Sequence, residues 1–167
     1  MHLESERLII REAKINDAPF YFNLFNNPDW IQFIGDKNLK SIKETESYLK
    51  DTLLKNLQTN GLGFFTVILK DTNQPIGTST ALQREKLDFI DIGYAFLPEA
   101  RNKGYAAEAT KLIIKYVRTT FKQEKVYAFT MPKNKASQKL LEKLGFKYIG
   151  VEKIFENSED FVFEYVF

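Results

Sequence analysis

The hydrophobic pattern of the first third of the chain changes from one period to another. The short apolar run between charged residues over Arg7–Glu12 predicts a strand. Apolar residues then recur at helical spacing, so we expect a helix that begins near Asn16 and stops at Asn26–Pro28. A capping box over Ser41–Glu44 opens a second helix, which we expect to end near Asn60.

The middle of the chain has the pattern of strands. The apolar runs Phe64–Leu69 and Ile76–Leu82 flank the turn residues Asp71–Pro75, which predicts a hairpin. Asp88–Phe96 predicts a further strand. Its alternation divides the side chains between two faces, with Ile90, Ile92, Tyr94 and Phe96 on one and Asp91, Gly93 and Ala95 on the other.

The last third alternates helices with strands. An apolar stripe predicts a long helix over about Tyr105–Phe121, and Lys125–Met131 follows as a strand. Ala136–Leu144 predicts a short helix, ended by a glycine suited to the left-handed position after a helix. Phe146–Val151 and Phe161–Phe167 complete the chain as two strands.

The order of these elements is β-α-α-β-β-β-α-β-α-β-β. The strand–helix–strand segment from 88 to 131 indicates a parallel pair inside an otherwise antiparallel sheet. We therefore predict the α+β class, with one mixed sheet and helices on both faces. The length, 167 residues without a repeat or linker, favours a single domain over residues 1–167.

The composition excludes several kinds of chemistry. The chain has no Cys, so disulfides, thiolate nucleophiles and Cys-ligated zinc are excluded. Its single His is His2, beside the N-terminus, which disfavours a Ser-His-Asp triad and a His-based metal site. We expect no bound metal.

Charge and hydropathy limit the kinds of binding partner that we expect. The net charge is +2, and the scattered lysines form no basic stripe, so we expect no nucleic-acid partner. The densest basic group is Lys133, Lys135 and Lys139, which fits one phosphate-bearing ligand or a solvated helix face. No signal peptide or membrane-spanning run is visible, so we expect a cytoplasmic protein without membrane contact.

One loop has the features of an anion site. The strand that ends at Pro98 is followed by a short loop and at once by a helix. Gly104 has no side chain and Ala106 a minimal one, so a ligand can approach the backbone closely. The free N–H groups of the first helical turn would suit a pyrophosphate. A plain turn remains the alternative, and the loop is neither a Walker A loop nor a dinucleotide fingerprint.

A second candidate lies one strand later. Asn134 follows a strand and precedes a helix, where its side chain can cap that helix. The functional alternative is that the Asn134 amide and the Ser137 hydroxyl face a ligand between the two diverging strands.

Taken together, four segments resemble the GNAT acetyltransferases, and within them the ribosomal-protein N-terminal acetyltransferases. They occur in the family's order and span nearly the whole chain. They are the first strand Glu4–Glu12, the strand Ile92–Glu99, the loop Arg101–Ala109, which matches the pattern [QR]xxGx[GA], and the late helix with its turn, Asn134–Phe146.

This resemblance implies acetyl-CoA as cosubstrate and a splayed parallel strand pair. It implies a bulge near Phe96 and Leu97, with pantetheine bonding the main chain there and the pyrophosphate bound by the following loop. Asn102 departs from the glycine that many relatives have. The implied cofactor-binding residues are Phe96, Leu97, Arg101, Asn102, Lys103, Gly104, Tyr105, Ala106, Asn134, Ser137 and Lys139.

The implied reaction is direct attack of a neutral amine on the thioester, which needs no cysteine. The amine must lose a proton, and Asp91 is our first candidate for the base, because it is an acid in the middle of a strand. Asp160 and Glu164 are alternatives, and a strand-surface carboxylate is the structural alternative for Asp91. Ser137 is the candidate acid toward the leaving thiolate.

The acceptor site is expected in the least regular segments, which are 26–39, 84–88 and 156–160. Trp30 and Phe33 are candidate wall residues, although packing on the sheet is the alternative. Asp160 is a candidate for attracting a cationic amine, with further acids at Asp29, Asp36, Glu156 and Glu159.

The acceptor itself stays open between a protein N-terminus and a small-molecule amine. The main rival function is a CoA-binding regulatory module without transferase activity, and a weaker rival is a nucleotide or nucleic-acid binder. We expect a monomer or a homodimer.

Overall fold

The computed structural model describes residues 1–85, 87–154 and 159–167. Its centre is one eight-stranded sheet with the order β1-β2-β3-β4-β5-β6-β8-β7. Among the strands in the described residues only β5 and β6 pair in parallel, so the α+β prediction with one parallel pair is confirmed. The strands are β1 His2–Glu4, β2 Leu8–Glu12, β3 Gly63–Leu69, β4 Gln74–Leu82, β5 Asp91–Phe96, β6 Lys125–Thr130, β7 Lys147–Glu152 and β8 Asp160–Val166.

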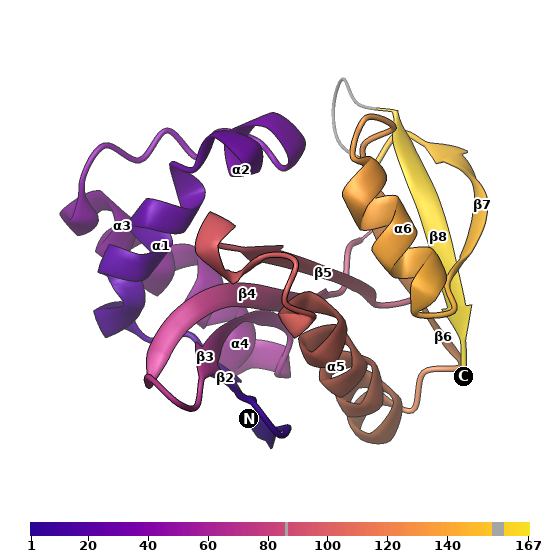
Figure 1. Ribbon diagram of the computed structural model, residues 1–167, viewed down its shortest axis with the longest axis horizontal. Coiled ribbons are helices and arrows are strands. Elements are labelled where there is room, and N and C mark those ends of the chain that lie inside the picture. The colour runs from indigo at the N-terminus through magenta and orange to yellow at the C-terminus, as the bar shows by residue number, and fades with distance from the viewer. Residues whose placement is uncertain (86, 155–158) are drawn as a thin grey trace.

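In the part of the chain that the structure describes, six α-helices pack around the sheet (Figure 1). A π-helical segment, Leu49–Leu53, joins two of them into one rod that spans the predicted helix 41–60. Within the described residues, no helix combines the length and apolar character that crossing a bilayer requires. The helices are α1 Ala18–Phe25, α2 Pro28–Phe33, α3 Ile42–Tyr48, α4 Leu54–Asn60, α5 Tyr105–Phe121 and α6 Lys135–Lys143.

Helix α2 corrects the prediction that residues 26–39 are irregular. Proline stops α1, but it is also well suited to the first position of a new helix, where no N–H partner is needed. Pro28 begins α2, and the Asn27 side chain caps it by accepting from the Asp29 N–H at 3.0 Å. The strand β1 was likewise not predicted, and it pairs with β2 at the sheet edge.

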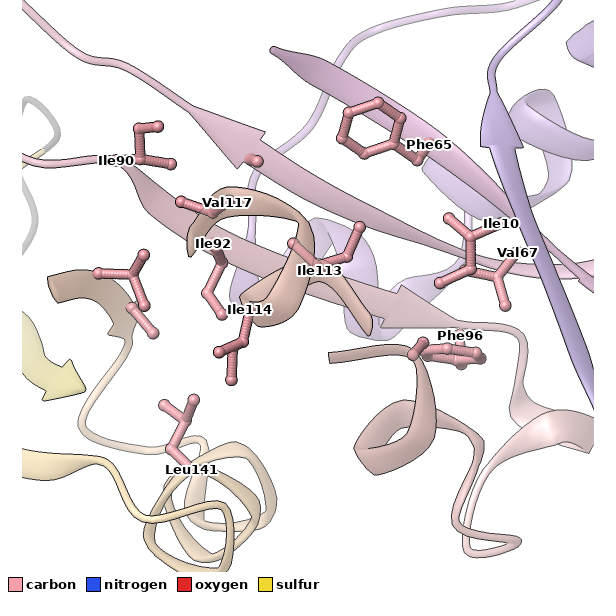
Figure 2. Close-up of a cluster of buried hydrophobic side chains, with 14 of the residues drawn as sticks. Ile10, Phe65, Val67, Ile90, Ile92, Phe96, Ile113, Ile114, Val117 and Leu141 are labelled. Atoms are coloured by element: carbon pink, nitrogen blue, oxygen red, sulfur yellow. The ribbon is translucent and has the colours of Figure 1, made fainter. Parts of the chain in front are cut away.

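The larger core fills one face of the sheet, beneath α5 and α6. Phe65 and Ile92 from the strands meet Ile113 and Val117 from α5, and Leu141 reaches in from α6 (Figure 2). Burying each of these side chains contributes about 1.5–3 kcal/mol of transfer free energy. The predicted apolar face of β5 is confirmed, since Ile90, Ile92 and Phe96 are buried in this core.

The opposite face carries the second core, formed mainly by α1, α2 and the rod that begins with α3. Strand alternation explains the division, because Phe65 enters the first core whereas its neighbour Thr66 faces the second. Tyr21 of α1 packs on this face and lies within hydrogen-bond distance of Thr66 and Thr78. Helices therefore cover both faces, as predicted.

Candidate functional site

Strands β5 and β6 open away from each other. Although each has six residues, they share a single register pair, Asp91 with Tyr127. On its other side β5 stays paired with β4 as far as Phe96. The expected splay of this parallel pair is confirmed, and it leaves the later half of β5 without a strand partner on the β6 side.

The main chain of β5 shows which groups face this opening. Leu97 N–H donates to Ile76 O at 3.0 Å, so this pair is bonded across β4 and β5. Because bonded and non-bonded pairs alternate in an antiparallel ladder, the main-chain groups of Tyr94 and Phe96 point toward the opening. The Phe96 carbonyl accepts from Arg101 Nε at 2.9 Å, which leaves the Phe96 N–H and the Tyr94 groups facing it.

The expected bulge near Phe96 and Leu97 is wrong. Throughout β4 and β5, both fully described, the register is regular. Register irregularities lie instead between β3 and β4, at Val67 and Ile68, and between β7 and β8, at Tyr148 and Gly150. The opening therefore comes from the early divergence of β6 rather than from an extra residue in β5. Leu97 itself is buried, and its carbonyl accepts from Ala100 N–H at 2.9 Å.

The loop after β5 presents the first turn of α5. Gly104 occupies the N-cap position with φ +82°, a left-handed conformation that favours glycine. No side chain caps this turn, and the N–H groups of Tyr105, Ala106 and Ala107 come before Glu108, whose N–H is the first to donate within the helix, to Gly104 O. The exposed Asn102 is also left-handed, at φ +58°. These donors and the helix dipole suit a pyrophosphate.

Two arginines hold this loop in place. Arg7 donates to the Lys103 carbonyl at 2.9 Å and to Glu108 Oε2 at 2.8 Å, and it lies 4.6 Å from the Tyr105 ring centre. A Cβ at Gly104 would lie 3.3 Å from the same guanidinium. On the other side, the Arg101 guanidinium forms an ion pair with Asp29 of α2. The Arg101 side chain is therefore engaged within the protein.

Ser137 and Asn134 lie at the start of α6. Asn134 Oδ1 accepts from Ser137 N–H at 3.1 Å, so the predicted capping interaction is observed. The Ser137 Oγ lies 3.0 Å from the Tyr94 hydroxyl of β5. Burial raises the pKa of Tyr94 to about 12. Lys139, two residues after Ser137 on α6, is exposed.

Asp91 is buried at the start of β5, with 3% of its surface exposed. Burial raises the pKa of its carboxyl, and the charge of Arg84, whose Nε lies 2.7 Å from Asp91 Oδ1, offsets this only in part. By strand alternation Asp91 points to the face opposite Tyr94. Asp91 and Ser137 therefore flank β5 from opposite faces of the sheet, and Asp91 is no surface carboxylate.

The predicted acceptor residues have different environments. Trp30 is buried, with its ring centre 4.7 Å from that of Phe25, so it packs in the second core. Phe33 is half-buried on α2. Asp160 is buried at the start of β8 and has interaction partners of its own. Glu156 lies outside the described residues.

Sequence reasoning missed Tyr94, Arg7 and Glu108. Tyr94 was placed correctly on an inward strand face, but its hydroxyl partner is 43 residues away. Arg7 and Glu108 are separated by 101 residues. A single sequence carries no signal for such pairs. Among the described residues, no group of His, Asp or Glu side chains forms a candidate metal site.

Comparison with known proteins agrees with this geometry. Residues 7–147 match the family model described as an acetyltransferase (GNAT) domain. The chain is 29% identical over 150 residues to the uncharacterized N-acetyltransferase YoaA of Bacillus subtilis strain 168, covering 89% of this chain and 84% of that protein. It is also similar to two solved structures of N-acetyltransferases.

The first is a ribosomal-protein-S5-alanine acetyltransferase from Vibrio fischeri, with a TM-score of 0.79, 22% identity, and coverage of 99% of this chain and 96% of that one. The second is a spermidine N-acetyltransferase from Vibrio cholerae in complex with CoA and spermine, with a TM-score of 0.79, 21% identity, and coverage of 97% and 96%.

The resemblance found in the sequence is thus confirmed, and the related folds include a ribosomal-protein acetyltransferase. The general reaction of this family is transfer of an acetyl group to an amine. Because the family model covers most of the residues, including β5, the loop and α5, the chain belongs to the GNAT family of N-acetyltransferases.

Proposed function

We propose that this protein transfers the acetyl group of acetyl-CoA to a primary amine, either a protein N-terminus or a small-molecule amine. One observation carries the proposal. The uncapped first turn of α5 lies directly after a strand whose main-chain groups face an opening. A pyrophosphate and a pantetheine arm need these two features next to each other.

The cofactor contacts follow from this arrangement. The pyrophosphate binds the loop from Arg101 to Ala106, mainly through backbone N–H groups. Pantetheine bonds the main chain of β5 near Phe96. Asn134 and Lys139 contribute from α6, and the charge of Lys139 suits a phosphate. Leu97 contributes by shaping the end of β5, because both of its main-chain groups are bonded within the protein.

The proposed reaction needs a base for the amine and hydrogen-bond donors for the leaving sulfur and the oxyanion. Asp91 takes the amine proton, directly or through water, and burial supports this by raising its pKa toward the range where a carboxylate is an effective base. Ser137 donates a hydrogen bond to the leaving sulfur from the opposite face. A β5 main-chain N–H that faces the opening, such as that of Tyr94, is suited to the oxyanion.

The acceptor approaches from the sheet face of Asp91, the face that carries the second core and α2, on which Phe33 is half-buried. The two solved relatives act on very different amines by name, a ribosomal protein and spermidine. Both classes therefore belong in the acceptor screen. The alternative function, a CoA-binding module, predicts cofactor binding without turnover.

A thermal-shift titration tests the proposal first. Acetyl-CoA and CoA should raise the melting temperature, since a ligand at 100 times its Kd adds about 2.7 kcal/mol of stability. ATP and NAD should not. CoA release is then measured with an alanine-led peptide and with spermidine as acceptors. Absence of a shift with either CoA species would contradict the proposal, and a shift without turnover on any amine would favour the binding module.

A further inference from the structure

Two hydroxyl groups meet where β5 faces α6. The Tyr94 hydroxyl lies 3.0 Å from Ser137 Oγ and 3.3 Å from the Ser137 carbonyl oxygen. Tyr94 belongs to the strand that diverges from β6, and Ser137 belongs to the first turn of the helix that follows β6. The contact therefore ties the two sides of the proposed cofactor site together.

The hydrogen bonds around this pair show which of its protons and lone pairs are already engaged. Helix α6 is capped through the Ser137 N–H and Asn134, so the cap leaves the Ser137 Oγ unused. Tyr94 is largely enclosed, and burial raises its pKa to about 12, so it keeps its proton at neutral pH. Each hydroxyl donates one hydrogen bond and accepts up to two. The Tyr94 proton can go to Ser137 Oγ at 3.0 Å or to the Ser137 carbonyl at 3.3 Å, and the shorter contact favours Oγ. With Tyr94 as the donor to Oγ, the Ser137 proton is left for a third group.

We propose that Tyr94 is a positioning residue that holds the Ser137 O–H toward the cofactor sulfur. This proposal rests on the acetyltransferase function proposed above. The amine nitrogen bonds to the acetyl carbon, the carbon–sulfur bond breaks, and sulfur takes the electron pair as a thiolate. The amine proton goes to the base, and the thiolate takes a proton from solvent after release. Ser137 donates a hydrogen bond to the thiolate, and the bond from Tyr94 strengthens it, because linked hydrogen bonds in a low dielectric polarise one another.

The first test is binding. Tyr94→Phe keeps the ring and removes only the hydroxyl. The probes are CoA and desulfo-CoA, in which hydrogen replaces the thiol. In the unsubstituted protein, the preference for CoA should grow about tenfold as the pH rises through the thiol pKa, which is the low end of the effect of one hydrogen bond to a charged group. In Tyr94→Phe this growth should be smaller, because Ser137 is no longer held toward the sulfur, while the affinity for desulfo-CoA stays unchanged.

The second test is turnover, with whichever amine the acceptor screen identifies. Tyr94→Phe should lower kcat about fivefold and change the KM for acetyl-CoA less than twofold. Ser137→Ala should cost at least as much, and adding Tyr94→Phe to it should cost nothing more, because both substitutions remove one linked unit. Tyr116→Phe is the matched control, since it removes a hydroxyl that donates to Gly61 O at 3.0 Å, at the far end of α5.

The outcomes separate the two proposals. A protein that binds CoA while Tyr94→Phe keeps the pH-dependent preference for CoA undiminished contradicts the positioning role and leaves the proposed function intact. Additive losses in the double variant also contradict it. A protein that binds neither CoA nor acetyl-CoA contradicts the proposed function, and the role of Tyr94 fails with it.

Discussion

Gly104 is the residue on which the proposed phosphate loop, residues 101–106, depends most. Its φ of +82° and the Arg7 guanidinium, 3.3 Å from where a Cβ would lie, both disfavour a side chain. Gly104→Glu adds strain, bulk and a negative charge at the proposed pyrophosphate site. We expect the affinity for acetyl-CoA, measured by calorimetry, to fall at least a hundredfold, or about 2.7 kcal/mol.

Asn73→Glu is the matched control for that substitution. Asn73 is exposed and left-handed, with φ +53°, in the turn between β3 and β4. It therefore receives the same carboxylate at a similar backbone conformation away from the loop. Equal affinities for acetyl-CoA in both variants would mean that Gly104 forms an ordinary turn.

The second prediction at the residue scale concerns the pH dependence of Asp91. A base must be deprotonated, so kcat/KM should rise with pH as Asp91 ionises. Because burial raises the pKa of Asp91, this rise should occur at a higher pH than for an ordinary aspartate. Asp91→Asn should remove this limb and lower kcat/KM about a hundredfold. Arg84→Gln should move the limb to higher pH, because Arg84 favours the ionised carboxylate. The ionisation of the acceptor amine stays in every profile.

A loss below threefold in Asp91→Asn, with an unchanged acid limb, would instead make Asp91 a structural partner of Arg84.

The candidate site was predictable from the sequence where a residue's own backbone conformation requires a particular residue type, as at Gly104. It was not predictable where two side chains meet across the fold. Asp91 is an intermediate case. Strand alternation predicts the face on which its side chain lies, but not its ion pair with Arg84.

At the scale of elements, the ion pair of Arg101 with Asp29 joins the phosphate loop to α2. Helix α2 has only six residues, so it is too short to be stable without tertiary contacts. Asp29→Ala should therefore speed amide hydrogen exchange in α2 about fivefold, the effect of roughly 1 kcal/mol. Both side chains are more than a third exposed, so global stability should fall by less than about 1 kcal/mol.

Glu46→Ala, which removes an exposed acid from α3, is the control for Asp29→Ala. If the two variants give the same exchange in α2, the loop does not hold this helix. The measurement is mass-spectrometric exchange of a peptide that covers residues 27–35.

The elements also differ in how far the sequence could predict them. Helix α5 begins and ends at the predicted residues, because its apolar stripe is long and a glycine precedes it. Helix α2 was missed, since the same proline that ends one helix can begin the next. The π-helical segment Leu49–Leu53 was missed as well, because its side chains keep the apolar spacing of a continuous helix.

At the scale of the whole molecule, a buried ionic contact stabilises the packing of α1 on the sheet. Asp17, just before α1, accepts two bonds of 2.7 Å from Arg11 of β2 and one of 2.9 Å from Thr66 of β3. Burial alone raises the pKa of Asp17, but the bonds from Arg11, Thr66 and the Lys14 N–H outweigh it. The pKa therefore lies below its ordinary value.

The sign of the pH effect follows from this lowered pKa. The unfolded chain binds the Asp17 proton more tightly than the folded protein, so the stabilisation is present above pH 3.8 and is lost as the pH falls through the lower, folded value. Asp17→Asn should cost about 2 kcal/mol at pH 7, the loss of hydrogen bonds to a charged group. Urea unfolding from pH 7 down to pH 3 should show this difference shrinking below pH 3.8. A difference that stayed constant with pH would mean that the amide and the carboxylate differ in packing rather than in charge, and that Arg11 does not stabilise the junction through its ion pair.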